Sequence, residues 1–218
     1  MQQRQSFDIA LKELKLKLLR MGGDIQDAIR IAVSALEKSD ISLAQEVVEN
    51  DIAINRQDHE VEDLCIRLIA TQQPVATDLR KIISGMRLSM DLERMGDLAV
   101  DIAKSTIRLN GQPISRNLDD IREMAQTIDQ MISEALNAYV NNDVEAARHL
   151  ASLDDDVDHR YRKLVEGLFA HSASSPSDTS QAMTLAFCGR YLERIGDHAT
   201  NIGESVIYII SGERSDLN

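Results

Sequence analysis

The chain has 218 residues, with 24 Lys and Arg against 36 Asp and Glu, which gives a formal net charge of −12 at pH 7. So acidic a protein is a poor partner for nucleic acid, because binding to the phosphate backbone depends on Lys and Arg displacing counterions, and it is equally unsuited to an anionic lipid surface. Hydrophobic residues make up 43%, aromatic residues 3% and proline three positions, which indicates a soluble helical protein with a buried core.

Six long helices are predicted. The first is the clearest, because apolar residues recur every three or four positions from Phe7 to Ala35, the spacing of a helix face packed against long neighbours. Short segments that contain proline or polar turn residues separate the periodic stretches. In chain order, the predicted helices cover residues 6–37, 41–72, 76–109, 117–141, 143–171 and 178–211. Long helices joined by short loops pack antiparallel into bundles, so we predict an all-α fold.

The chain also repeats itself. Residues 92–97 read LERMGD and residues 192–197 read LERIGD, and the second helices of the two halves align with Asp51 opposite Asp154. A long internal repeat indicates a duplicated unit of supersecondary structure. We therefore predict two tandem three-helix bundles related by a pseudo-twofold repeat, the first over residues 1–112 and the second over 113–218.

No apolar run approaches the ~20 residues that cross a bilayer. The N-terminus mixes charged with apolar residues and lacks the continuous apolar stretch of a secretory signal. The cysteines, Cys65 and Cys188, each lie within an apolar helical pattern and are expected to be buried packing residues. Together these features predict a cytoplasmic protein.

Acidic residues spaced at four are the most informative feature of the third and sixth predicted helices. Glu93 and Asp97 lie on one helix face, and Glu193 and Asp197 repeat the arrangement. Like charges at this spacing destabilise a helix by roughly 0.2–0.5 kcal/mol. In the first half the same face continues as an apolar stripe toward the N-terminus, and buried carboxylates are stable only when protonated, paired or bound to a cation.

Two further patterns support a cation site at the acidic residues of each half. Gly96 and Gly196 lie in mid-helix between the two acids, where glycine costs about 1 kcal/mol relative to alanine, which is understandable if another group approaches the backbone closely. The second helix of each half adds oxygen-bearing side chains spaced at four, namely Asp51 with Asn55 and Asp154 with Asp158. Such all-oxygen sets suit hard cations such as Mg²⁺, Mn²⁺, Ca²⁺ or iron.

Two other interpretations of the acids stay open from spacing alone. They could form a solvated face on a purely structural helical scaffold, or belong to a carboxylate-bridged metalloenzyme. The Glu-x-x-His pair of di-iron bundle enzymes is missing, and the sequence has no phosphate-binding loop, nucleophile elbow or HExxH motif. The histidines are scattered, although His198 directly follows Asp197. We therefore expect no catalytic activity.

The chain resembles the PhoU family of phosphate-uptake regulators. The resemblance rests on LERMGD, on LERIGDHATNIGE, on the helix opening QPVATDLR and on RMGGDIQDAIRIAVSAL near the N-terminus, and it extends from about residue 6 to residue 212. It implies two three-helix bundles and a regulator that is not an enzyme. Such proteins are taken to repress the phosphate-starvation response when phosphate is plentiful, to restrain the phosphate ABC importer and to couple it to a sensor histidine kinase.

The resemblance also implies partners and a metal site. The expected partners are the ATPase subunit of the importer and the histidine kinase, with no nucleic acid, and a homodimer is an open possibility. In the family, motifs of the E(D)-x-x-x-D type bind multinuclear iron clusters or related metals, which leaves zinc, manganese and other divalent cations as alternatives. Carried over to this sequence, the ligands are Asp51, Glu93 and Asp97 in the first bundle and Asp154, Asp158, Glu193 and Asp197 in the second. Asn55 and Asn201 depart from a fully acidic set.

Overall fold

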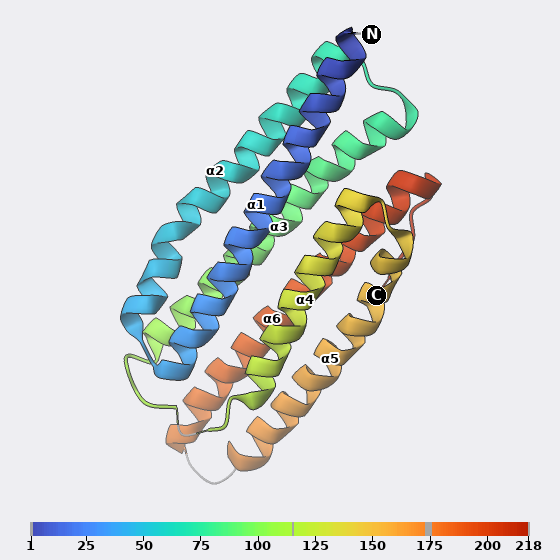
Figure 1. Cartoon of the computed structure of the whole chain (residues 1–218). Helices are drawn as coiled ribbons and strands as arrows, with labels where there is room; N and C mark the ends of the chain where they lie inside the picture. The colour runs from blue at the N-terminus through green and yellow to red at the C-terminus, as the bar shows by residue number, and fades with distance from the viewer. Residues whose placement is uncertain (1, 115, 173–175, 218) are drawn as a thin grey trace.

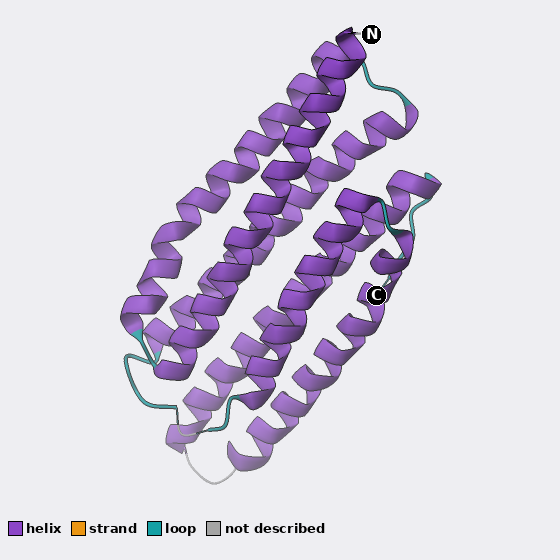
Figure 2. Ribbon diagram, viewed as in Figure 1, coloured by secondary structure: helices purple, strands orange, loops and turns teal. Residues whose placement is uncertain are grey.

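The computed structural model describes residues 2–114, 116–172 and 176–217 and, within them, contains six helices and no strands (Figures 1 and 2). The helices are α1 (Gln2–Lys38), α2 (Ile41–Gln72), α3 (Ala76–Arg108), α4 (Asp119–Asn141), α5 (Val144–Ser172) and α6 (Pro176–Ser211). The predicted all-α fold is confirmed. The largest difference from the predicted bounds is at the start of α1, which begins at Gln2 rather than at residue 6.

The helices form two antiparallel three-helix units that lie side by side. In each unit all three helices contact one another, α1 with α2 and α3, and α4 with α5 and α6. The units meet along α3 and α6, which run in opposite directions, and along α1 and α4, whereas α2 and α5 lie at the outer edges (Figure 1). The boundary predicted at residues 112/113 falls in the segment that connects α3 to α4.

The repeat is visible in how the middle helices begin. Asp40 accepts hydrogen bonds from the backbone N–H groups of Ser42 and Leu43 at 3.0 and 3.1 Å, which caps the start of α2. Asp143 does the same at the start of α5, where it accepts from Glu145 and Ala146 at 3.0 and 3.1 Å. A side-chain cap of this kind satisfies backbone donors that the first helical turn leaves unpaired. The two turns were therefore duplicated together with the helices.

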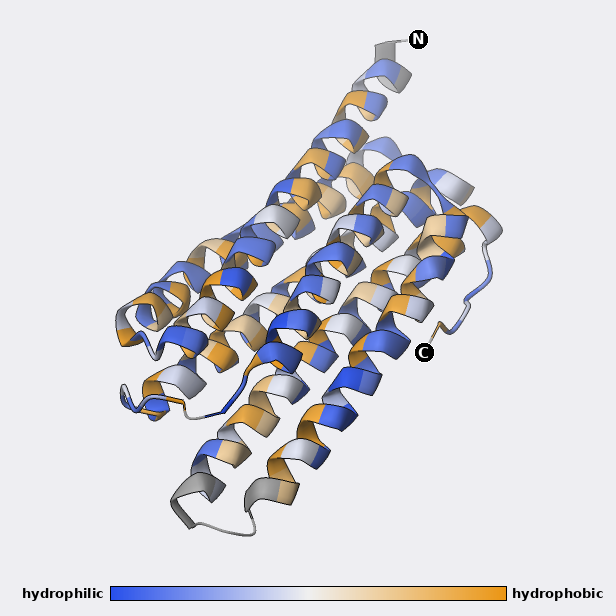
Figure 3. Ribbon diagram, turned by 60° about the horizontal axis from the view of Figure 1, so that its bottom comes forward, coloured by the Kyte–Doolittle hydropathy of each residue, from blue (hydrophilic) through white to orange (hydrophobic). Residues whose placement is uncertain are grey.

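A single core runs through both units. Polar and apolar residues alternate around each helix (Figure 3), and the apolar faces point inward. Two side chains of α4 cross into the first unit: Leu136 lies over Gly22 of α1, and the Tyr139 hydroxyl lies over Gly85 of α3, where a Cβ would stand 2.9 Å from it. Cys65 and Cys188 are fully buried, which raises the pKa of each thiol to about 12 and confirms that they are packing residues.

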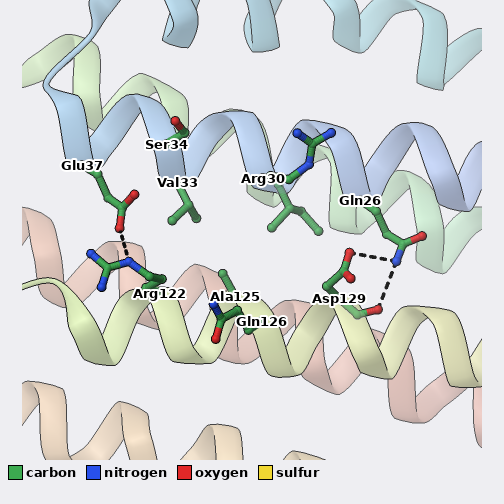
Figure 4. A pocket seen from close by; sticks show the side chains of 10 residues that line it. Gln26, Arg30, Val33, Ser34, Glu37, Arg122, Ala125, Gln126 and Asp129 are labelled. Carbon is green, nitrogen blue, oxygen red and sulfur yellow. Dashed lines mark hydrogen bonds and ion pairs between the residues drawn. The ribbon is translucent and has the colours of Figure 1, made fainter.

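Polar side chains join α1 to α4 at two points. Gln26 donates to the Asp129 carboxylate at 2.9 Å and to the Ser133 hydroxyl at 2.9 Å, and Arg122 pairs with Glu37 at 2.8 Å. Between the two points lies a groove of about 440 Å³ with an apolar floor (Figure 4). None of the helices in the described ranges is both long enough and apolar enough to span a membrane.

Two glycines give a matched test of this packing. A Cβ on Gly203 would lie 2.9 Å from the backbone oxygen of Ala147 and 2.8 Å from Leu150 Cδ1, whereas a Cβ on Gly23 would meet nothing within 4 Å. Gly203→Ala is expected to lower the free energy of unfolding by about 1–3 kcal/mol, because a backbone atom cannot move aside. Gly23→Ala is expected to raise it by roughly 0.5–1 kcal/mol through helix propensity. Urea titrations of the two variants measure both changes, and equal effects would contradict the packing described.

Candidate metal centres

The first group of predicted ligands lies between α2 and α3. Burial raises the pKa of Asp51 on α2, and the negative charge of Asp97 on α3 raises it further. Burial likewise raises the pKa of Glu93, with a second contribution from Asp97 and a smaller one from Asp51. The three carboxylates predicted from the sequence therefore lie close enough to repel one another, as the antiparallel packing of α2 and α3 requires. We call them the first acidic cluster.

Some oxygen atoms of this cluster have no partner. Asp51 accepts one hydrogen bond, from the Asn55 side-chain amide at 3.0 Å. The other carboxylate oxygen of Asp51 and the amide oxygen of Asn55 are buried and receive no hydrogen bond from any described residue. Arg94 pairs with Asp97 at 2.9 Å and lies 3.5 Å from Glu93, so a basic neighbour offsets part of the charge on the α3 side.

The second group lies between α5 and α6 and is more deeply buried. Asp154 and Glu193 are each only 8% exposed. Burial raises the pKa of both side chains to about 7, and the charges of Asp197 and Asp158 add to the effect. Burial also raises the pKa of Asp197, with Asp158 contributing. The four predicted ligands of this half form the second acidic cluster.

Glycine decides how closely the helices approach at this cluster. A Cβ on Gly196 would lie 2.9 Å from Asp154 Oδ1, closer than real side chains come, and a Cβ on Gly96 would lie 3.7 Å from Asp51 Oδ1. A carboxylate therefore approaches closely only at Gly196, whereas at Gly96 the tight neighbour is Ile54 Cγ2, 3.3 Å from such a Cβ, and Asp51 lies at ordinary contact distance. Because any other residue at position 196 would push the carboxylate away, the glycine holds Asp154 against the backbone of α6.

The second cluster too has buried oxygens without partners. Asp154 Oδ1 and Glu193 Oε2 receive no hydrogen bond within the described ranges, while the other oxygen of Glu193 pairs with Arg190. A buried acceptor without a partner costs about 1–3 kcal/mol, and a cation bound to the free oxygens would remove that cost. The donor set thus fits a hard cation in each half. As the side chains stand, no group of three or more His, Cys, Asp or Glu among the described residues is arranged to hold a metal ion.

Asn201 and His198 do not complete the second cluster but reach across to the other unit. Asn201 donates its side-chain amide to Asp91 Oδ1 at 3.1 Å, and His198 Nδ1 lies 2.9 Å from the same oxygen. Sequence spacing placed Asn201 in line with Glu193 and Asp197, and only the packing of α6 on α3 directs it elsewhere. Asp58 was not predicted to lie near the first acidic cluster. Its negative charge contributes to the raised pKa of Glu93.

Comparison with known proteins confirms the resemblance seen in the sequence. The PhoU domain matches the chain twice, at residues 18–106 and 121–206, once in each three-helix unit. The chain belongs to the PhoU family. The predicted tandem bundles are thereby confirmed, whereas the residue at which one PhoU repeat passes into the next stays a prediction.

Relatives and solved structures of PhoU proteins match over nearly the whole chain. A phosphate-specific transport system accessory protein PhoU homolog from Clostridium acetobutylicum is 41% identical over 216 residues, 99% of each chain. The crystal structure of PhoU from Pseudomonas aeruginosa has a TM-score of 0.89 and 36% identity, covering 95% of this chain and 100% of that one. The phosphate transport system regulatory protein PhoU from Streptococcus pneumoniae also has a TM-score of 0.89, at 28% identity, covering 96% and 99%.

The raised pKa of Asp154 predicts how the stability of this PhoU-family chain depends on pH without metal. Because the folded state holds a proton on Asp154 up to about pH 7, whereas the ordinary pKa is 3.8, the folded state binds more protons and loses stability as the pH rises through that window. Asp154→Asn removes the ionisation. It should raise the melting temperature of chelator-treated protein at pH 8 and change it little at pH 4.

Asp156→Asn is the matched control, because Asp156 is exposed on the same helix and should leave the melting temperature nearly unchanged at both pH values. Equal stabilisation by Asp154→Asn at pH 4 and at pH 8 would show that ionisation of Asp154 does not limit stability.

Proposed function

We propose that this PhoU-family chain is a non-enzymatic regulator of phosphate uptake that restrains the phosphate ABC importer and keeps phosphate-starvation genes repressed when phosphate is plentiful. The observation that carries the proposal is the match of both repeats, with nearly complete coverage, to proteins named as accessory or regulatory components of phosphate transport. A regulator of this kind acts by binding other proteins, and the fold offers long helical surfaces for that purpose.

The proposed partners are the cytoplasmic ATPase subunit of the importer and a phosphate-sensing histidine kinase, so the chain would work on the cytoplasmic side of the membrane. Binding of one chain to both proteins would let the transport state of the importer reach the kinase.

A metal is the proposed cofactor, with multinuclear iron as the first choice and manganese or zinc as alternatives. The residues that would hold it are Asp51, Glu93 and Asp97 in the first cluster and Asp154, Asp158, Glu193 and Asp197 in the second. Support comes from the unpartnered buried oxygens and from the repulsion among the carboxylates. A bound cation would supply positive charge that neutralises these acids and ties α2 to α3 and α5 to α6.

The two clusters should differ in affinity. The helix before the motif offers Asp158 in the second cluster where the first has the neutral Asn55, and a charged oxygen binds a hard cation more strongly than an amide oxygen does. Protein prepared without chelator should contain at least one metal ion per chain by elemental analysis. Glu193→Ala with Asp197→Ala should remove more of it than Glu93→Ala with Asp97→Ala.

The control for this measurement is Asp156→Ala with Glu166→Ala, which removes two carboxylates that are exposed on α5. This variant should retain the metal. The same metal content in all four proteins would overturn the assignment of the clusters as ligands and return the acids to the interpretation of a solvated face.

The regulatory role is tested in cells. Deletion of the gene should leave a phosphate-starvation reporter on in phosphate-rich medium, and the intact gene should switch it off again. Pull-down at high phosphate should recover the ATPase subunit or the kinase. A reporter that stays off in the deletion strain would contradict the proposed function. Full complementation by a Glu93→Ala, Glu193→Ala variant would instead show that these two acids play no part in regulation.

A further inference from the structure

A groove between α1 and α2 concentrates positive charge in this acidic protein. It has a volume of about 230 Å³ and is lined by Lys17, Arg20, Ala53, Arg56, Gln57 and Glu60. Three of these side chains are cationic and one is acidic, whereas the whole chain carries a net charge of −12. The cations come from both helices, so only the packing of α1 on α2 brings them together.

The single carboxylate in the groove is already neutralised. Lys17 Nζ lies 2.7 Å from Glu60 Oε2, and this hydrogen bond is the largest of the effects that hold the pKa of Glu60 below its ordinary value. The charges of Arg56 and Arg20 lower the same pKa further. All three cations therefore act on one region of the groove.

Two guanidinium groups of the groove act on Glu60 only at longer range, without a direct ion pair to it. Neither Arg20 nor Arg56 makes a hydrogen bond or ion pair with any residue that the structure describes, and both side chains are exposed. A guanidinium presents a planar fork of donors that matches the oxygens of phosphate, and charge-assisted bonds of this kind are about twice as strong as neutral ones. Two such forks at one groove are suited to a small oxyanion.

Gln57 adds no free donor to the groove. Its side-chain N–H group donates to Asp24 Oδ2 at 2.6 Å, which fixes the orientation of the amide, because a carboxylate oxygen requires a donor. Its carbonyl oxygen is then a buried acceptor that receives no hydrogen bond from the residues described. Because this oxygen is closed to solvent, an anion in the groove does not contact it, and the cationic side chains carry the binding.

We propose that the α1–α2 groove binds inorganic phosphate, with Arg20, Arg56 and Lys17 holding its oxygens. The binding site itself stands on these residues. Its biological meaning rests on the proposed function, because a phosphate site would give a regulator of phosphate uptake a direct input.

Isothermal titration calorimetry of inorganic phosphate into chelator-treated full-length protein tests the site, since a bound metal could also hold phosphate. We expect one phosphate per chain and weaker binding at higher ionic strength. Arg20→Ala and Arg56→Ala should each weaken binding about tenfold, without loss of folding, because neither side chain makes a hydrogen bond or direct ion pair with a described residue. Glu60→Gln should strengthen binding, because it releases Lys17 from its ion pair and removes a negative charge.

Arg67→Ala is the matched control, since Arg67 is exposed on α2 outside the groove and should leave the affinity unchanged. The absence of phosphate binding, or unchanged binding in both arginine variants, would overturn the proposal. If the reporter responds to gene deletion but calorimetry shows no binding, only the site is wrong. The reverse result would retain the site and reject the proposed function.

Discussion

The burial of carboxylates between packed helices is the constraint on which both acidic clusters depend. Gly196 leaves room for Asp154 to lie against α6, and Asp51 packs at ordinary contact distance from Gly96 of α3. One oxygen of each of these two carboxylates is closed to water. The consequences follow from electrostatics: the buried acids resist ionisation, repel their neighbours and keep oxygens for which the fold supplies no donor. A protein that needed only stability would fill these positions with apolar side chains.

Duplication did not produce two identical centres. In the second half Asp154 and Glu193 are nearly inaccessible, and their pKa values rise to about 7. In the first half Asp51 already accepts a hydrogen bond from Asn55, and the α3 acids are more exposed and contact Arg94. The second cluster therefore carries more negative charge that no neighbouring group compensates. In the first cluster, neighbouring side chains already compensate more of the negative charge.

The two units share one hydrophobic core. Leu136 and Tyr139 of α4 pack into the first unit over glycines, and Asp91 of α3 accepts from Asn201 and contacts His198 of α6. Glu93 follows Asp91 by two residues, and Asp197 directly precedes His198. Each acidic cluster therefore includes residues of α3 or α6, the two helices that pack directly against each other between the repeats.

The sequence by itself determined the six helices, the tandem repeat and the seven acids of the two clusters, because these depend on local periods of three and four residues and on a comparison of the two halves. Only the tertiary structure decided which oxygens are left without partners, because that depends on neighbours from other helices. It directed Asn201 away from the cluster that its spacing predicted. It also brought Arg20 and Arg56 together, 36 residues apart in the sequence, because a groove between two helices has no signature in the period of either helix alone.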